Sequence, residues 1–209
     1  MALKKRKAEK AELEITDEVK NKDTEAAGEG KINIARELFG MVIYIALVVL
    51  AVWFIVNYVG QRTEVSGESM YDTLDDGDNL WVDKLSYRFK DPERFDIVVF
   101  PYQDSDVYFI KRIIGLPGEK IRIDFEGNIY INDKVLEENY GYEQIMPGMV
   151  GRAVDDIILG DDEYFVMGDN RNNSKDSRFE DVGNIKREDL VGKAAIRMWP
   201  FSKFGKIEK

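Results

Sequence analysis

The chain contains a serine and a lysine whose surroundings could give them catalytic chemistry. Ser69 lies in ESMYDTL, residues 68–74, a stretch built from turn and strand residues. Lys111 lies in VYFIKRII, residues 107–114, where nearly all neighbours are apolar. An ammonium group in apolar surroundings loses hydration, so its pKa falls and its neutral form becomes available as a general base. Lys111 could therefore activate Ser69 as a nucleophile.

Two amino acids are missing from the chain, and their absence restricts the chemistry. With no cysteine and no histidine, there is no disulfide, thiol nucleophile, His/Cys zinc site or Ser-His-Asp triad. A neutral lysine is then the only basic partner that could activate Ser69 at neutral pH. We expect neither a cofactor nor a metal. Both residues also have ordinary alternatives, because serines commonly bond within turns and strand lysines commonly reach solvent.

A third stretch, GDNRNNSKDSR at residues 168–178, directly follows the apolar segment Tyr164 to Met167. It combines turn-forming residues, hydroxyl groups and an Asp/Arg pair. A solvated turn is one alternative. A calcium-binding EF-hand loop is excluded, because Arg171 and Ser174 stand where that loop needs an acid or amide and a glycine.

These stretches occur in a recognisable order. SGESMYDTL (66–74), DGDNLWV (76–82), YFIKRIIGLPGEK (108–120), GDNRNNSKDSR (168–178) and GKAAIRMWPFSKFGKI (192–207) follow one another along the chain. Together they resemble the ordered boxes of type I signal peptidases, the membrane-anchored Ser/Lys proteases that remove signal peptides from exported proteins. The likeness runs from about Val65 to Ile207. The single apolar span, short insert and lysine base make it similar to the bacterial, especially Gram-positive, branch.

The resemblance implies a Ser/Lys dyad in which Ser69 attacks a peptide carbonyl, Lys111 is the general base and an acyl-enzyme forms. The family cuts after small residues, such as alanine, at the first and third positions before the scissile bond. The implied partners are the signal peptides of exported preproteins, each adding as an extended strand. The substrate edge is expected at Val65, Ser66, Glu68, Met70 and Tyr108.

The resemblance also implies supporting groups around the dyad. Three contacts are expected: Ser174 with Lys111, Asp176 with Arg178, and Asp169 with Arg112. The Ser69 backbone N–H and the Gly67 region would hold the oxyanion.

Residue 72 departs from the family pattern and leaves a second hypothesis open. Many relatives carry a proline where this chain has Asp72. The aspartate can still form a turn, but its negative charge could raise the pKa of a nearby Lys111 and oppose the neutral form. The alternative function is a catalytically silent, membrane-anchored scaffold that binds signal peptides without cleavage. A self-cleaving Ser/Lys repressor is disfavoured, because residues 1–37 offer no helix-turn-helix.

The catalytic candidates must be positioned by a β-rich domain. Between residues 78 and 199, strand-sized runs rich in Val, Ile, Phe and Tyr are separated by Gly, Asp, Asn and Pro, and several alternate with period two. We predict a mainly β fold with a coiled antiparallel, barrel-like sheet. Residues 126–136 should form a hairpin with Asn132-Asp133 at its tip, within an inserted excursion at about 124–160. A short helical turn is expected at 186–190.

A single apolar segment precedes this domain. Residues 38–59, LFGMVIYIALVVLAVWFIVNYV, contain no charge and would span about 33 Å as a helix at about 1.5 Å per residue. This predicts one transmembrane helix that is retained as an anchor in the lipid bilayer, with a buried core helix as the alternative. Residues 1–37 carry nine basic and nine acidic side chains and few apolar ones, which predicts a disordered cytoplasmic tail.

The charges near the span predict its orientation. Of the nine basic residues before the span, four lie closest to it, and one lies shortly after it: Lys20, Lys22, Lys31 and Arg36, then Arg62. By the positive-inside rule, the N-terminus is expected in the cytoplasm and residues 60–209 on the outer side of the cell membrane. That outer domain holds the whole net charge of −10, so nucleic acid is not expected as a partner.

Overall fold

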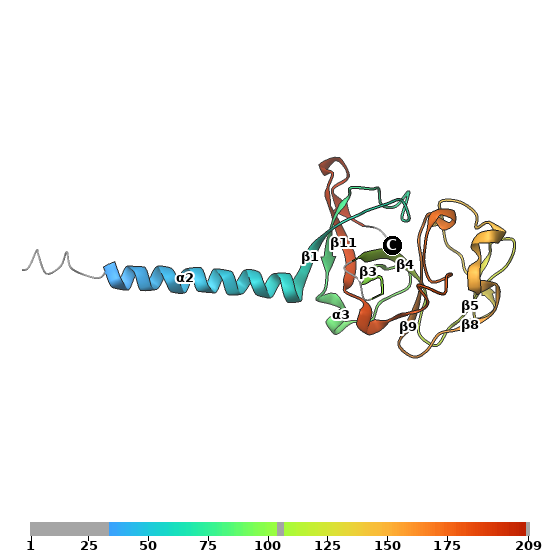
Figure 1. Ribbon diagram of the computed structural model, residues 1–209, viewed down its shortest axis with the longest axis horizontal. Helices are drawn as coiled ribbons and strands as arrows, with labels where there is room; N and C mark the ends of the chain where they lie inside the picture. Colours follow the sequence, from blue (N-terminus) through green and yellow to red (C-terminus); the bar gives the residue numbers. More distant parts are fainter. Residues whose placement is uncertain (1–33, 104–106, 208–209) are drawn as a thin grey trace, which may run out of the picture. The chain divides into compact units, whose positions relative to one another are not determined.

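The computed structural model describes residues 34–103 and 107–207. The chain divides into two units, with the boundary between Trp53 and Phe54. The first unit contains most of a long helix, and the second is a β-rich domain (Figure 1).

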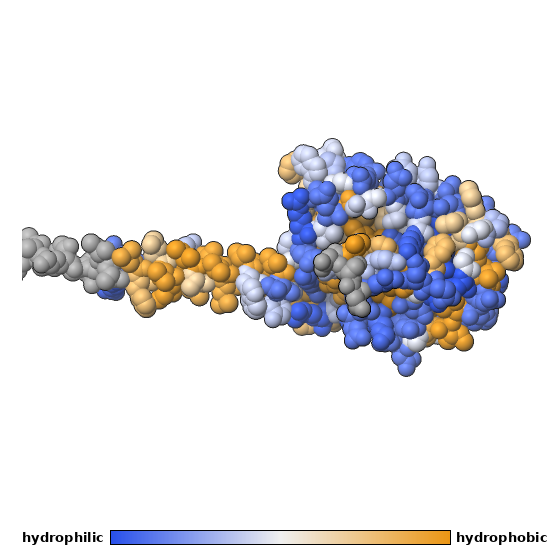
Figure 2. All heavy atoms as spheres, in the orientation of Figure 1, coloured by the Kyte–Doolittle hydropathy of each residue, from blue (hydrophilic) through white to orange (hydrophobic). Residues whose placement is uncertain are grey.

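Helix α2, Ile34–Phe54, is charged only in its first turn, at Arg36 and Glu37. A π-helical turn, Ile55–Val59, continues it. The segment Arg36–Val59 has a mean hydropathy of 2.8 in its most apolar window, which is 0% buried, and Figure 2 shows mostly hydrophobic residues along it. The segment is therefore long and apolar enough to cross a membrane. The helix begins before the predicted start at residue 38, and the rest of the predicted disordered tail, residues 1–33, lies outside the described residues.

The larger sheet of the second unit has eight strands, all paired antiparallel. They are β1 Gly60–Glu64, β2 Asn79–Asp83, β3 Ile97–Pro101, β4 Tyr108–Gly115, β9 Glu163–Met167, β10 Ile185–Lys186, β11 Gly192–Trp199 and β12 Gly205–Lys206. The strand order is β1-β2-β11-β3-β4-β9-β10, with β12 beside β11. The predicted mainly antiparallel β fold is confirmed. In the described part of the chain the sheet stays open, with β1 and β10 at its two ends, so it is not a closed barrel.

A smaller antiparallel sheet has the order β7-β6-β5-β8. Its strands are β5 Lys120–Ile123, β6 Ile129–Ile131, β7 Lys134–Val135 and β8 Ile157–Ile158. Asn132 and Asp133 join β6 to β7 with φ angles of 50° and 65°. Positive φ at both central residues matches a two-residue hairpin turn, so the predicted hairpin is confirmed.

Short helical turns connect several strands. They are α3 Ser86–Phe89 and the 3₁₀ turns Pro147–Met149, Gly151–Val154, Arg171–Asn173, Arg187–Asp189 and Phe201–Lys203. The turn at 187–189 lies where a helical turn was expected. Strand β1 was not predicted, because GQRTE lacks apolar alternation; its pairing with β2 from Gly60↔Asp83 to Glu64↔Asn79 holds it in the sheet.

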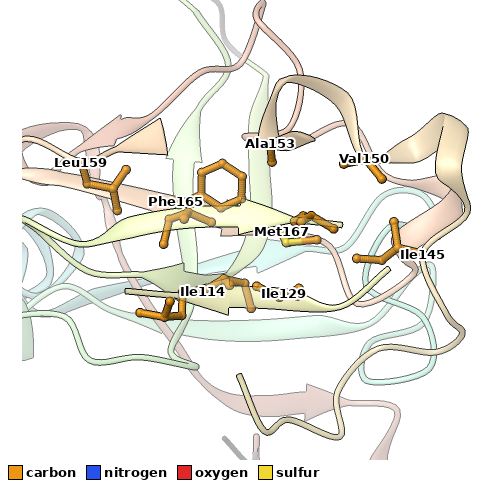
Figure 3. Packing of buried hydrophobic residues seen from close by; sticks show 11 residues of the cluster. Ile114, Ile129, Ile145, Val150, Ala153, Leu159, Phe165 and Met167 are labelled. Atoms are coloured by element: carbon orange, nitrogen blue, oxygen red, sulfur yellow. The ribbon is translucent and has the colours of Figure 1, made fainter. Parts of the chain in front are cut away.

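A hydrophobic cluster joins the two sheets. It includes Ile114 of β4 and Phe165 and Met167 of β9, which pack with Ile129 of β6 (Figure 3). Ile121 of β5 belongs to the same cluster and is fully buried. Burying one such side chain stabilises the fold by about 1.5–3 kcal/mol. This cluster therefore fixes β4, the strand that carries Lys111.

Candidate active site

Ser69 lies in the loop of residues 65–78, between β1 and β2. The loop is closed at its base by a hydrogen bond from the Val65 N–H to the Asp78 carbonyl, at 2.8 Å. Met70, the next residue after the serine, is only 1% exposed. Its burial anchors the loop to the core, and Ser69 itself stays half-buried at the surface.

Lys111 comes from the middle of β4, opposite Val98 of β3. Its Nζ donates hydrogen bonds to Ser69 Oγ at 2.8 Å and to the Ile110 carbonyl at 3.0 Å. The same nitrogen lies 4.9 Å from the centre of the Phe109 ring, and the residue is only 3% exposed. The structure thus brings the predicted nucleophile and the predicted base into direct contact.

Burial lowers the pKa of Lys111 to about 8, because it disfavours the charged ammonium. The carboxylates of Asp176 and Asp169 oppose this shift, and Arg178 adds to it. Asp72, the residue whose charge was expected to oppose the neutral lysine, is exposed and is not among the groups that shift this pKa. A substantial neutral fraction of Lys111 is therefore available near pH 8.

The hydrogen bond of the Ser174 hydroxyl differs from the expected one with Lys111. Within the described residues, its Oγ donates to Asp176 Oδ2 at 2.7 Å, and the hydrogen bonds of Lys111 go to other groups. Arg178 binds the same carboxylate, with its Nε 2.8 Å from Oδ1, and both members of this ion pair are fully buried. The expected Asp176–Arg178 pair is present. Donation to a charged acceptor makes this a strong hydrogen bond, so Ser174 is held by Asp176.

Arg112, the next residue along β4, forms the expected pair with Asp169. Its Nε lies 2.9 Å from Oδ1 and its Nη2 2.7 Å from Oδ2, and both side chains are fully buried. Thr73 Oγ1 also donates to Asp169 Oδ2, at 2.6 Å. This cluster ties β4, the loop after β9 and the loop of Ser69 together. No role was predicted for Thr73, which stands in the same sequence box as Ser69.

The loop after β9 presses against the backbone of Ser69. Asn170 donates its N–H to the Ser69 carbonyl and its Nδ2 to the Glu68 carbonyl, both at 3.1 Å. A Cβ atom on Gly168 would lie 2.4 Å from the Ser69 carbonyl oxygen and 2.3 Å from Ser174 Oγ, so only glycine fits there. Both residues belong to the GDNR stretch, but a contact with a backbone carbonyl leaves no signal in a sequence.

The two groups expected to hold an oxyanion differ in their availability. The Gly67 N–H donates to Asp76 Oδ1 at 2.7 Å. The Ser69 N–H makes no hydrogen bond within the described part of the chain. Of these two donors, only the Ser69 N–H is free to bind a negatively charged oxygen.

A cleft of about 240 Å³ opens beside Ser69 and Lys111. Segments 64–66 and 108–110 form much of its wall. Four of the five residues expected at the substrate edge line it: Val65, Ser66, Met70 and Tyr108. Glu68 does not line the cleft; its carboxylate accepts a hydrogen bond from Asn173 at 3.4 Å. Lys175, a residue with no predicted role, also lines the cleft.

The site offers a hydroxyl, a lysine amine with a lowered pKa, and a free backbone N–H. Among the described residues, no three Asp or Glu side chains lie together in a way that could hold a metal ion. A nucleophile, a base and an oxyanion donor in contact are the groups that acyl transfer requires.

Known proteins resemble this chain over most of its length. Residues 38–199 match the family model described as signal peptidase, peptidase S26. A probable signal peptidase I-2 of Synechocystis sp. is 40% identical over 167 residues, which are 77% of this chain and 72% of that protein. Signal peptidase I T of Bacillus subtilis is 35% identical over 191 residues, 88% of this chain and 96% of that protein. A solved signal peptidase I from Enterococcus faecalis V583 is 32% identical, with a TM-score of 0.41, and covers 50% of this chain and 97% of that one.

The family model covers more than half of the chain, and the alignments with the relatives extend over most of their own lengths. The resemblance seen in the sequence boxes is therefore confirmed. This chain belongs to the signal peptidase I family of serine endopeptidases, peptidase S26.

Proposed function

We propose that this protein is a membrane-anchored endopeptidase that removes N-terminal signal peptides from exported proteins, cutting after small-x-small sites such as Ala-x-Ala. Membership of the signal peptidase family supports the substrate class. The single observation that supports the mechanism is the contact of 2.8 Å between Lys111 Nζ and Ser69 Oγ.

Ser69 is the proposed nucleophile, and Lys111 is its general base. Neutral Lys111 takes the proton from Ser69 Oγ as that oxygen attacks the peptide carbonyl, and the resulting ammonium protonates the leaving amine. Water then attacks the acyl-enzyme, with Lys111 again as the base. This step releases the signal peptide with a new carboxyl terminus and restores the serine hydroxyl.

The surrounding groups have proposed roles in holding this geometry. The Ser69 N–H would stabilise the oxyanion, while Gly67 shapes the loop through its left-handed backbone, with φ at +92°. Two buried ion pairs and one hydroxyl would keep β4 in register with the loop of residues 65–78, here called the nucleophile loop: Arg112 with Asp169, Arg178 with Asp176, and Ser174.

We further propose that residues 38–59 cross the lipid bilayer, with the tail 1–37 in the cytoplasm and the domain 60–209 on the outer side. The apolar segment Arg36–Val59 supports the anchor by its length of 24 residues. The basic residues before the span support the orientation. Within the outer domain, residues of about 124–160 form the proposed insert.

Binding without cleavage is the less favoured alternative. It rested on the charge of Asp72, and that residue is exposed and absent from the groups that shift the pKa of Lys111. If the alternative were correct, the unaltered chain would bind signal peptides without turnover, and Asp72→Pro would restore cleavage if the aspartate is the cause.

The test is turnover of a fluorogenic Ala-x-Ala signal peptide by the detergent-solubilised full chain. We expect Ser69→Ala and Lys111→Ala each to abolish cleavage while the protein stays folded, because each removes one half of the dyad. The matched controls are Ser202→Ala and Lys134→Ala, two exposed residues outside the site, which should cleave normally. Near-normal turnover by either dyad variant would contradict the mechanism.

A further inference from the structure

Lys175 separates two hollows in the surface beside Ser69. One is the catalytic cleft described above. The other, here called the Phe179 groove, has a volume of about 580 Å³, and its lining includes Met149, Asn173, Ser174, Lys175, Phe179 and Asp181. Because Lys175 lines both hollows, they adjoin across a single side chain.

The side chain of Lys175, which forms the wall between the two hollows, is held by contacts that lead towards the active site. Lys175 Nζ donates to the Tyr102 hydroxyl at 2.7 Å and forms an ion pair with Asp181. The Tyr102 ring stacks on Phe109 with the ring centres 4.5 Å apart. Phe109 in turn lies 4.9 Å from Lys111 Nζ. Lys175 and Lys111 also line the same cleft, so a peptide that passes over Lys175 stays beside the active site.

The Phe179 groove also adjoins the nucleophile loop. Asn173, which lines the groove, donates a hydrogen bond to the carboxylate of Glu68, the residue before the nucleophile. A substrate whose acyl half occupies the catalytic cleft is cut at the carbonyl next to Ser69, so its remaining residues must leave the cleft there. The groove offers the neighbouring space on the side of the loop after β9.

The polar groups that line the groove already have partners. The side-chain amide of Asn172 accepts from the Met146 N–H at 2.8 Å and donates to the Gln144 carbonyl at 2.9 Å. The charge of Lys175 is compensated by Asp181. An apolar occupant would therefore leave these hydrogen bonds intact, and it would gain contact with half-buried Met149 and Phe179.

We propose that the Phe179 groove binds the first residues after the scissile bond, and that it prefers an apolar side chain there. The inference rests on the proposed function, since it assigns the leaving half of the same substrate. It makes Phe179 and Met149 specificity-determining residues for the segment that becomes the new N-terminus of the exported protein.

The test compares three substrates that share one Ala-x-Ala acyl half. The first has leucine at both positions after the cut, the second has glycine at both, and the third is an ester with a small alcohol in place of the leaving peptide. We expect Phe179→Ala in the full chain to lower kcat/KM for the leucine peptide about tenfold, the loss typical of an emptied apolar pocket. The glycine peptide and the ester should be cleaved as by the unaltered chain.

A second variant and a control keep the result interpretable. Met149→Ala should lower kcat/KM for the leucine peptide in the same selective way. Phe125→Ala, a matched truncation at a 66% exposed position in the turn between β5 and β6, should change none of the three rates.

Two outcomes would overturn the inference alone. Equal losses on all three substrates would mean that Phe179 acts through the fold, and unchanged rates would mean that the groove stays empty during the reaction. If the unaltered chain cleaves none of the three, the proposed function itself fails, and the inference fails with it.

Discussion

Opposing influences act on Lys111, and their balance sets its protonation. Burial disfavours the ammonium, while the carboxylates of Asp176 and Asp169 favour it. Each of these carboxylates is already bound by its own buried arginine, so much of its charge is compensated before it acts on the lysine. Burial therefore prevails, and the pKa falls to about 8.

The pKa of Lys111 predicts how the rate of cleavage depends on pH. As pH rises towards 8, the neutral fraction of Lys111 grows, so kcat/KM for the Ala-x-Ala peptide should rise about tenfold per pH unit and level off above that pKa. Initial rates measured across this range would check the prediction. A profile that is already flat well below pH 7 would contradict a lysine base whose pKa is about 8.

At the scale of single residues, the sequence predicted the site where the type of amino acid decides its chemistry, and it did not predict contacts that depend on the fold. Ser69 and Lys111 became candidates because the chain lacks the alternative bases and the lysine stands among apolar neighbours, and the resemblance of their sequence boxes to signal peptidases led to their prediction as a pair. The contact of Ser174 could not be predicted, because it depends on whether the lysine or the Asp176 carboxylate is the better-placed partner. Thr73 was missed because a threonine in a turn has many ordinary roles.

At the scale of elements, the segment after β9 is a close-fitting part of the site. Gly168 lies between the Ser69 carbonyl and the Ser174 hydroxyl, and Asn170 continues the contact with the nucleophile loop. The segment is fixed from the other side by the buried Arg112–Asp169 pair. The positions of β4, β9 and the nucleophile loop are therefore coupled.

The tight fit of Gly168 predicts a local effect of a single methyl group. Gly168→Ala should lower the free energy of unfolding by about 1–3 kcal/mol, because overpacking forces backbone and side chains apart, and it should also lower kcat by displacing Ser69. Urea unfolding and peptide turnover would measure both effects.

Gly148→Ala is the matched control, since a Cβ at Gly148 would meet nothing within 4 Å. It should leave stability and turnover close to those of the unaltered chain. Equal behaviour of the two variants would show that the segment after β9 has room to move.

The strands could be predicted where apolar alternation marks one buried face, as in β5, where buried Ile121 and Ile123 alternate with half-buried Lys120 and Arg122. Strand β1 carries no such pattern and is held by its partner β2, which is a tertiary effect. The openness of the sheet could not be read from the chain either, since closure depends on how the last strands pair.

At the scale of the whole molecule, the two units that meet between Trp53 and Phe54 differ in where their apolar side chains lie. The helix exposes large apolar side chains along its length, whereas the β-rich unit buries three apolar clusters of its own. A unit with its own core should keep its fold without the helix. Membrane attachment and catalysis should therefore be separable.

Removal of residues 1–53 tests this separation. We expect the shortened chain to hydrolyse a soluble Ala-x-Ala peptide, because the Ser69 site lies entirely in the second unit. Alkaline carbonate should release it from membranes, while the full chain should need detergent. Retention of the shortened chain in the carbonate pellet would mean that the second unit itself is embedded in lipid.

The long apolar segment and the net charge of the β-rich unit could be predicted from composition, because length, hydropathy and charge are sums over residues.

Side chains alternate between the two faces of β4, so the pairing register of this strand determines which cation faces Ser69. Successive side chains of a strand point to opposite faces, so Lys111 meets Ser69 while Arg112 meets Asp169. A slip of one residue would exchange the two cations. A guanidinium, which stays charged in proteins, would then face the serine, and an ammonium without the planar fork would face the carboxylate. The pairing register of β4 therefore decides whether a lysine or an arginine faces Ser69, even though all 209 residues stay the same. Only the register that places the lysine there gives this chain a base for catalysis.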